Sequence, residues 1–382
     1  SWRGTGEGFL SPAILDKVRE LHKAYRKTLA CPSCPIADKE SICFSEGPFS
    51  GMKSYTTAFM GLKETYGGAE AGEMLGRGFK MVDVMNRLGL DEHNINKMLP
   101  VVIKLYKEGK INPSSTMGFA LSEEFQSRIE LLEMIAHRRG FGNLLADGVD
   151  EALKKLDLNP TELTTTVKGY QTLMEPRLNA MGTMEFEMLV NPRGGVTAMG
   201  AIGSPSYNPG RPVEQFLKQS DRVGVPMEAR ERIFSKDSFN PARLARYAED
   251  WFSLHNMLGL CHRLYISRFH SLSGVTAFYN ALTGQQKSGT DLLLASERAW
   301  NLWRHLNARL GIDAKNDRPP KSWFRPLRIG DEEFTMKDYY GRKDLSEKDV
   351  LQLLQDYYDE RGWDLQTGNP DKKKLTQLGI DV

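Results

Sequence analysis

Apolar residues recur along most of this chain at the three- and four-residue spacing of amphipathic helices. The first such segment follows Ser11 and Pro12, a capping residue and a proline suited to the first helical position, and it leads directly into a loop at Cys31. The apolar faces of four segments are Ile14, Leu15, Val18, Leu21 and Ala24; Phe125, Ile129, Leu132 and Ile135; Leu293, Trp300, Trp303, Leu306 and Leu310; and Val350, Leu353, Leu354, Tyr357 and Tyr358. We predict a helix over each of them.

Start and stop signals bound these helices. Ser122 precedes the second predicted helix, and Gly140 ends it. The fourth begins at Ser346, with Asp349 three residues later in the pattern of a capping box, and it stops at Gly362.

Strand-like alternation is scarce by comparison. Short stretches such as 161–167 and 184–190 have an extended character, and neither makes a sheet by itself. We therefore expect a mainly α protein of two helical domains. A proline-rich break at 204–212 places the boundary between them, which gives domains of residues 1–205 and 206–382.

The composition indicates a substantial core and no polyanionic partner. Of the 382 residues, 40% are hydrophobic, which supports a buried core. The 51 basic and 49 acidic side chains leave a formal charge of +2, so charge gives no argument for nucleic acid or an anionic membrane as partner. No apolar run reaches the length of a membrane span and no secretory signal pattern occurs, so we expect a cytoplasmic protein.

Three of the four cysteines crowd into one short segment: Cys31, Cys34 and Cys43. The Cys-Pro-Ser-Cys spacing lets two thiolates reach one metal centre from a tight loop, while Cys261 arrives from far along the chain. Soft thiolate ligands suit an iron–sulfur cluster, and a structural zinc site would use the same residues. The alternative is that these are buried free cysteines, a common state of this residue type.

Two segments that are far apart in the sequence echo each other. They are Asn86-Arg-Leu-Gly89-Leu90-Asp91 and Asn256-Met-Leu-Gly259-Leu260-Cys261. The repetition indicates two related helix-to-loop elements that face a shared ligand. Without a ligand, the two glycines would simply end helices.

Taken together, these motifs resemble the second and third domains of the tungsten-dependent aldehyde ferredoxin oxidoreductase family. The remaining motifs that carry the resemblance are the segment from Ile135 to Gly148, Val167-Lys168-Gly169 with Glu175-Pro176-Arg177, and the tail Tyr357-Tyr358-x3-Gly362-Trp363-Asp364. Single fragments are weak signals, but their order and spacing extend over nearly the whole chain.

The resemblance implies a tungsten or molybdenum ion held by two pyranopterins, with Mg²⁺ as a candidate bridge between the pterin phosphates. It also implies a [4Fe-4S] cluster that passes single electrons to a ferredoxin or another electron-carrier subunit. The residues that match the pterin motifs are Asn86, Gly89, Leu90, Asp91, Asn256, Gly259 and Leu260. In the family pattern the cysteine of the second motif, here Cys261, is also a cluster ligand, and Arg193 is a further candidate contact with a pterin phosphate.

The cluster loop departs from the family at its third ligand. The family pattern is Cys-x2-Cys-x3-Cys, and Asp38 occupies the third cysteine position here. A carboxylate binds a cluster iron less tightly than a thiolate does, which predicts a labile corner or an altered potential. Cys43 is the alternative ligand if the loop bends back, and a three-iron cluster is a third arrangement. The set that we predict first is Cys31, Cys34, Asp38 and Cys261.

The acid/base groups of aldehyde-oxidising family members are missing from the matching stretches, 54–56 and 193–197. Each pterin motif also begins with Asn where the family usually has Asp, so a neutral amide replaces a charge. Candidate replacements for the acid/base groups are Glu46, His93, His255, His262 and His270, and Tyr55 is a candidate hydrogen-bond donor. His255 and His262 are favoured because they flank the second motif.

Nothing in the chain resembles the β-rich N-terminal domain of the family, so we expect a separate chain to supply it. The first residue is not Met, which fits a processed product, a fragment or one piece of a split protein. The favoured function is a tungsten-pterin and iron–sulfur oxidoreductase acting on aldehyde and carboxylate couples. The alternatives are an aryl-CoA reductase-like tungsten enzyme and a non-catalytic electron-transfer or structural subunit.

Overall fold

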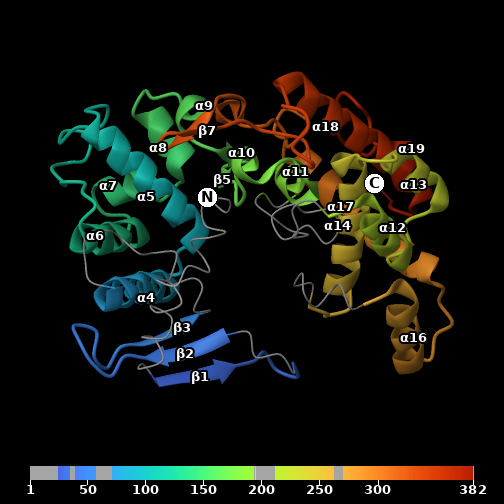
Figure 1. Cartoon of the computed structure of the whole chain (residues 1–382), viewed down its shortest axis with the longest axis horizontal. Coiled ribbons are helices and arrows are strands. Elements are labelled where there is room, and N and C mark those ends of the chain that lie inside the picture. Colours follow the sequence, from blue (N-terminus) through green and yellow to red (C-terminus); the bar gives the residue numbers. More distant parts are fainter. Residues whose placement is uncertain are drawn as a thin grey trace. The chain divides into compact units, whose positions relative to one another are not determined.

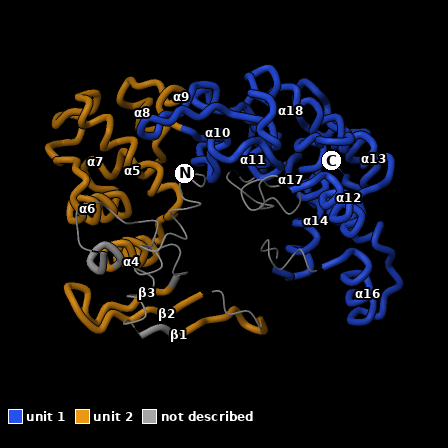
Figure 2. The backbone as a smooth tube through the Cα atoms, in the orientation of Figure 1, with its two compact units in different colours: residues 1–2, 165–382 blue, residues 3–164 orange. Residues whose placement is uncertain are grey.

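A computed structural model describes residues 25–34, 39–56, 71–192, 194, 211–261 and 270–381 (Figure 1). The chain forms two compact units, which we call the N-terminal unit (residues 3–164) and the C-terminal unit (residues 165–382, with residues 1–2) (Figure 2). Helices dominate both, so the expectation of a mainly α protein is confirmed. The division between the units precedes the predicted domain boundary at 205/206, which stays a prediction.

The N-terminal unit combines a small antiparallel sheet with a group of helices. Its elements are β1 (Tyr25–Leu29), β2 (Lys39–Cys43), β3 (Lys53–Thr56), α4 (Ala71–Leu88), α5 (Glu92–Lys107), α6 (Phe125–Ala136), α7 (Phe141–Leu145), α8 (Val149–Lys155) and α9 (Pro160–Leu163). The strands pair in the order β1-β2-β3, and β3 packs against α4. Ile42 and Phe79 are fully buried between the sheet and this helix.

The sheet is a correction to the sequence prediction. A strand, β1, precedes the Cys31 loop where a helix was expected to lead into it, and residues 1–24, which carry the predicted helix, lie outside the described residues. The sequence of β1 has little apolar alternation of its own. The strand is held extended by its pairing with β2, from Tyr25↔Cys43 to Leu29↔Lys39. Such pairing depends on contacts that no local pattern reports.

The C-terminal unit is built around α14, which packs against α11, α17 and α18. Its elements are β4 (Thr166–Val167), β5 (Tyr170–Gln171), α10 (Pro176–Asn179), α11 (Thr183–Val190), α12 (Val213–Arg222), α13 (Met227–Ile233), α14 (Pro241–Met257), α16 (Leu272–Thr283), α17 (Gly289–Arg309), η1 (Lys321–Phe324), β6 (Leu327–Ile329), β7 (Glu332–Phe334), α18 (Glu347–Arg361) and α19 (Lys372–Gln377). Trp251, Trp300 and Trp363 are buried in its core.

Three predicted helices are confirmed. They correspond to α6, α17 and α18. The Ser346–Asp349 capping box and the left-handed Gly362 bound α18 as predicted, whereas α6 begins after Glu124 and ends at Ala136, short of the predicted signals Ser122 and Gly140. The extended character expected for 184–190 is wrong, because this stretch belongs to α11, whose residues are all buried. Residues 184–188 alternate Met and Phe with Glu185 and Glu187, which resembles a strand pattern, but both glutamates are buried, so the alternation does not mark an inner and an outer face. None of the described helices is long and apolar enough to cross a membrane.

Candidate functional site

The first Asn-x-x-Gly-Leu segment ends helix α4 in the N-terminal unit. Gly89 has a left-handed backbone with φ of 68°, and its N–H donates to the Asn86 carbonyl at 3.3 Å. The Leu90 N–H donates to the Met85 carbonyl at 2.9 Å. These two bonds form a Schellman motif, which satisfies the last carbonyls of a helix. Asp91 then caps α5 by accepting from a backbone N–H of its first turn at 2.8 Å.

The second segment ends α14 in the C-terminal unit with the same geometry. Gly259 also has φ of 68°, and its N–H donates to the Asn256 carbonyl at 3.1 Å. The Leu260 N–H donates to the His255 carbonyl at 2.8 Å. The repetition seen in the sequence is therefore a repetition of one backbone loop, once in each unit.

Both loops leave room for a ligand. Among the residues that the structure describes, no atom lies within 4 Å of the position that a side-chain Cβ would take at Gly89 or Gly259. The side chains of Asn86, Asn256 and Cys261 are exposed. Open backbone beside an amide that both donates and accepts fits the edge of a pterin ring, whose heteroatoms offer donors and acceptors.

A pair of histidines adjoins the second loop. The His255 side chain is completely buried, and its Nδ1 lies 2.8 Å from the Trp251 carbonyl oxygen. Its Nε2 lies 2.9 Å from Nδ1 of His270, which is half-buried at the start of the segment leading into α16. Burial and the positive charge of Arg222 lower the pKa of His270. The structure thus brings together two of the five candidate acid/base residues.

The Cys31 and Cys34 side chains leave a tight turn at the end of β1. The Cys34 N–H donates to the Cys31 carbonyl at 3.1 Å, and Ser33 between them has φ of 60°. The Cys31 thiol is exposed, and the Lys39 ammonium donates to its sulfur at 3.2 Å. An exposed cysteine and a half-buried cysteine on one turn, with a cation beside Cys31, fit a site for an anionic cluster.

Cys43 lies away from this turn. It stands at the far end of β2, four residues beyond Lys39, which corresponds to about 13 Å along a strand. A loop bending back was the condition for Cys43 to replace Asp38 as a ligand, and the paired strands hold Cys43 at the opposite end of the hairpin from Cys31. Asp38 itself lies outside the described residues.

Tyr55 is brought to the first loop by β3. It pairs with Ser41 in the sheet, is 58% exposed, and lies on the strand that packs against α4. The pKa of Arg87 on α4 is raised mainly by its hydrogen bond and ion pair with Asp83, and Tyr55 adds to this shift. Tyr55 is therefore within electrostatic range of Arg87, two residues before Gly89.

The remaining site residues predicted from the sequence are Glu46, His93, Arg193 and His262. Glu46 is exposed in the loop after β2, and His93 is half-buried on α5. Arg193 and His262 lie outside the described residues. Within the described ranges, no three His, Cys, Asp or Glu side chains gather as a metal site. The predicted ligand set includes Asp38 and spans both units, so it stays a prediction.

The C-terminal unit also contains buried charges that sequence reasoning missed. The Arg361 guanidinium bonds Glu249 at 2.7 Å and Asp250 at 2.6 Å, and the Tyr357 hydroxyl donates to Glu249 at 2.6 Å. Burial raises the pKa of Glu249 to about 7 despite this guanidinium. Tyr357 belonged to a recognised motif, but only the contact between α14 and α18 identifies its partners.

A second buried cluster holds the Val167-Lys168-Gly169 motif. Lys168 sits in the turn between β4 and β5 with φ of 53°, and its ammonium bonds Asp317 at 2.6 Å and the Leu189 carbonyl. Arg304 bonds the same carboxylate through two nitrogens, and the Tyr358 hydroxyl donates to it at 2.7 Å. The motif is therefore an anchor of the fold in the core of the unit.

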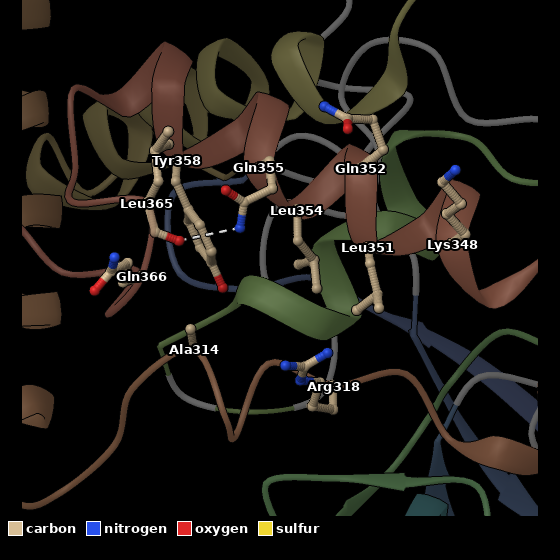
Figure 3. Close-up of a pocket in the computed structure, with 10 residues that line it drawn as sticks. All are labelled: Ala314, Arg318, Lys348, Leu351, Gln352, Leu354, Gln355, Tyr358, Leu365 and Gln366. Atoms are coloured by element: carbon tan, nitrogen blue, oxygen red, sulfur yellow. Dashed lines mark hydrogen bonds between the residues drawn. The ribbon is translucent and has the colours of Figure 1, made fainter.

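A pocket of about 320 Å³ opens beside α18 (Figure 3). Its lining is Ala314, Arg318, Lys348, Leu351, Gln352, Leu354, Gln355, Tyr358, Leu365 and Gln366. The Gln355 amide crosses it to donate to the Leu365 carbonyl at 3.0 Å. The lining contains none of the residues that the sequence predicts for the site.

Comparison with known proteins identifies relatives over almost the whole sequence. The family model described as aldehyde ferredoxin oxidoreductase, domains 2 and 3, matches residues 8–380. The tungsten-containing aldehyde ferredoxin oxidoreductase of Pyrococcus furiosus is 25% identical over 301 residues, which cover 77% of this chain and 44% of that protein. The enzyme of the same name from Pyrococcus horikoshii is 23% identical over 299 residues with the same coverage. The chain thus spans less than half the length of these curated relatives.

Among solved structures, the active site complex BamBC of benzoyl coenzyme A reductase, in complex with 1,5-dienoyl-CoA, has a similar fold. The TM-score is 0.72 at 17% sequence identity, and the match covers 97% of this chain and 55% of the other. At this identity the likeness concerns the fold alone.

Proposed function

Because the chain belongs to the aldehyde ferredoxin oxidoreductase family, we propose that it forms the helical part of a tungsten-pterin oxidoreductase. The observation that carries the proposal is the pair of Schellman loops at Gly89 and Gly259, which share φ, hydrogen bonds and open space above the glycine. A helix end needs no exposed Asn three residues before its glycine. Two such loops with the same exposed amide are explained by two similar ligands.

The residues present fit the cofactors that the family implies. Asn86 and Asn256 would bind the pterins with Gly89, Leu90, Asp91, Gly259 and Leu260, Arg193 would contact a phosphate beside Mg²⁺, and Cys31, Cys34, Asp38 and Cys261 would hold the cluster. When bound, a tungsten or molybdenum pterin supplies a two-electron redox step and a [4Fe-4S] cluster relays single electrons. The protein contributes the orientation of both groups and the charge around them.

Proton handling falls to the chain's own side chains. The exposed Tyr55 hydroxyl would donate a hydrogen bond to a substrate or oxo ligand, and His255 and His262 flank the second loop. The oxidation of an aldehyde by water to a carboxylic acid releases two protons with two electrons, so the site needs at least one group that accepts a proton near neutral pH. Imidazole is the side chain suited to that task.

The proposed partners are a ferredoxin-type electron carrier and a chain that supplies the remainder of the family fold. Large apolar side chains are exposed on and beside two helices: Phe278 and Leu282 on α16, Leu306 on α17, and Leu310 directly after α17, with exposures from 46% to 84%. Apolar exposure of this kind is typical of a surface that another protein covers. The chain spans 44% of its curated relatives, so the missing part of the fold is the occupant that we assign.

The candidates for the substrate class come from the relatives. An aldehyde and carboxylic acid couple is the favoured choice, following the names of the curated relatives. An aryl-CoA reductase-like reaction is the second candidate, because the benzoyl coenzyme A reductase complex shares the fold over 97% of the chain. A non-catalytic electron-transfer subunit is the third.

Metal and pterin analysis of the native particle, purified without oxygen, tests the proposal. Tungsten or molybdenum with two pterins per chain supports the oxidoreductase. Iron alone would make the chain an electron-transfer subunit, and zinc alone a structural protein. Native mass spectrometry of the same particle would detect a partner whose sequence resembles the missing family domain, and Leu282→Glu should release that partner.

A further inference from the structure

The rings of His255 and His270 meet edge to edge. Their planes are inclined by 6° and their centroids lie 5.1 Å apart. The Nε2 to Nδ1 distance of 2.9 Å is shorter than the roughly 3.5 Å at which carbon atoms of stacked rings pack, so the rings share a plane rather than lie face to face. An N–H of one ring therefore points at the lone pair of the other.

The hydrogen bonds fix which nitrogen carries each proton. A carbonyl oxygen only accepts, so His255 Nδ1 must be the donor to Trp251. In the neutral ring, His255 Nε2 is then an acceptor, and His270 Nδ1 must donate to it. His270 Nε2 is left with a free lone pair, and within the described part of the chain it has no hydrogen-bond partner.

We propose that His270 is the proton acceptor beside the second loop, and that His255 is a positioning residue that presents it. The buried His255 ring has no nitrogen left for a substrate, whereas the half-buried His270 offers Nε2. The same His255 residue supplies its carbonyl to the Leu260 N–H, so its backbone closes the loop while its ring holds His270. This inference rests on the proposed function.

The proton transfer conserves charge and atoms. Oxidation of a hydrated aldehyde to the carboxylic acid gives up two protons and two electrons: one proton binds His270 Nε2, the other goes to solvent, and a bound redox cofactor would accept the electrons. The imidazolium keeps its Nδ1–H bond to His255, and the proton then passes to solvent. Arg222 on α12 is the charged group that faces His270, and it favours the return of the proton because it opposes positive charge on the ring.

Carbethoxylation by diethyl pyrocarbonate, followed by peptide mass spectrometry, tests the arrangement without needing activity. The reagent attacks unprotonated accessible imidazole nitrogens, so we expect His270 to be modified and His255 to remain unmodified in the native protein. Modification of His255 at the rate of His270 would overturn the proposal. The result is independent of cofactor content, so a failure here and a failure of the proposed function are distinguishable.

Variants of His255 test the positioning role. His255→Phe removes the acceptor for the Nδ1–H of His270. The imidazolium of His270 loses that stabilising bond, so the pH midpoint of its modification should move to lower pH. In His255→Gln the amide can bond both the Trp251 carbonyl and His270, so the midpoint should stay near the original value. Identical midpoints in all three proteins would overturn the role of His255. If His255→Phe fails to fold, the modification of His270 and the protection of His255 in the native protein still test the arrangement.

Activity of the loaded enzyme gives the last readout. His270→Gln should lower kcat by about 100-fold or more with little change in KM, the range expected when a general base is removed. His255→Phe should also lower kcat, and His255→Gln, whose amide can replace the ring in both hydrogen bonds, should recover most of that loss. An unchanged kcat and pH profile in His270→Gln would show that another group accepts the proton.

Discussion

The carboxylate of Glu249 lies 2.7 Å from the guanidinium of Arg361, and both side chains are almost completely buried. Asp250 shares the same guanidinium, so two carboxylates face one cation. Burial raises the pKa of Glu249 to about 7, and the negative charge of Asp250 adds to this against the opposing effect of Arg361.

Glu249→Gln should change how stability depends on pH. The carboxyl titrates higher in the folded chain than in the unfolded chain, so its contribution to stability is fully present below about pH 4.3 and is lost as the pH rises to 7. Relative to Glu249→Gln, the native protein should therefore lose roughly 3 kcal/mol of unfolding free energy between those limits. Urea denaturation at a series of pH values measures this difference.

Glu297→Gln is the matched control for that experiment. Ion pairs with Arg246 and Lys374 lower the pKa of Glu297, so its contribution is present at neutral pH and is lost as the pH falls. The two variants should therefore show pH dependences of opposite sign. Parallel curves would mean that Glu249 ionises as an ordinary surface carboxylate does.

Gly89→Ala and Gly259→Ala should each cost about 1 to 2 kcal/mol of unfolding free energy, because a Cβ is disfavoured at φ of 68°. We further expect both to reduce pterin content, since the Cβ would occupy the open space above the loop. Gly311→Ala is the control, because Gly311 ends α17 in the same Schellman geometry with equally open space. Equal pterin loss in all three variants would argue against the two loops as binding elements.

Iron content should distinguish the cysteines. Cys31→Ser and Cys34→Ser should lower the iron bound per chain, whereas Cys43→Ser should leave it unchanged because Cys43 stands at the other end of the hairpin. Asp38→Cys should tighten the cluster and change its electron paramagnetic resonance spectrum. Iron loss in Cys43→Ser, with an unaltered spectrum in Asp38→Cys, would identify Cys43 as the ligand instead.

Arg222→Gln should raise the pKa of His270. The guanidinium disfavours a second positive charge nearby, and its removal relieves that effect while burial of the ring persists. The midpoint of His270 titration, followed by NMR of ¹⁵N-histidine-labelled protein, should therefore move to higher pH. Arg230→Gln on α13 serves as the control, because Arg230 pairs with Asp221 and does not contribute to the shift of His270.

Local sequence signals were sufficient to predict those helices whose apolar pattern lies within their own residues. The helices α6, α17 and α18 have apolar stripes within their own residues, a serine capping box starts α18, and the left-handed glycines at 89 and 259 mark the turns after α4 and α14. The strands β1 to β3 have no such signal, because they depend on each other for their hydrogen bonds. They were missed for that reason.

Pairings between distant residues were beyond the sequence alone. His255 and His270 were both candidates, but their shared plane depends on the path of the chain between them. Lys168 was recognised only as part of a motif, and its bond to Asp317 depends on the folded core. Spacing identifies which chemistry a segment can offer, whereas the partner of each group is fixed by tertiary structure.

Helix α11 has no side chain facing water, and this constrains when it can form during synthesis. A helix of eight residues is unstable alone, because its few hydrogen bonds do not offset the entropy of nucleation. It gains its stability only by packing, and α14, which it contacts, follows it along the chain. The segment 183–190 should therefore stay unstructured after it leaves the ribosome, and its Met, Phe, Leu and Val side chains stay exposed until α14 has been translated.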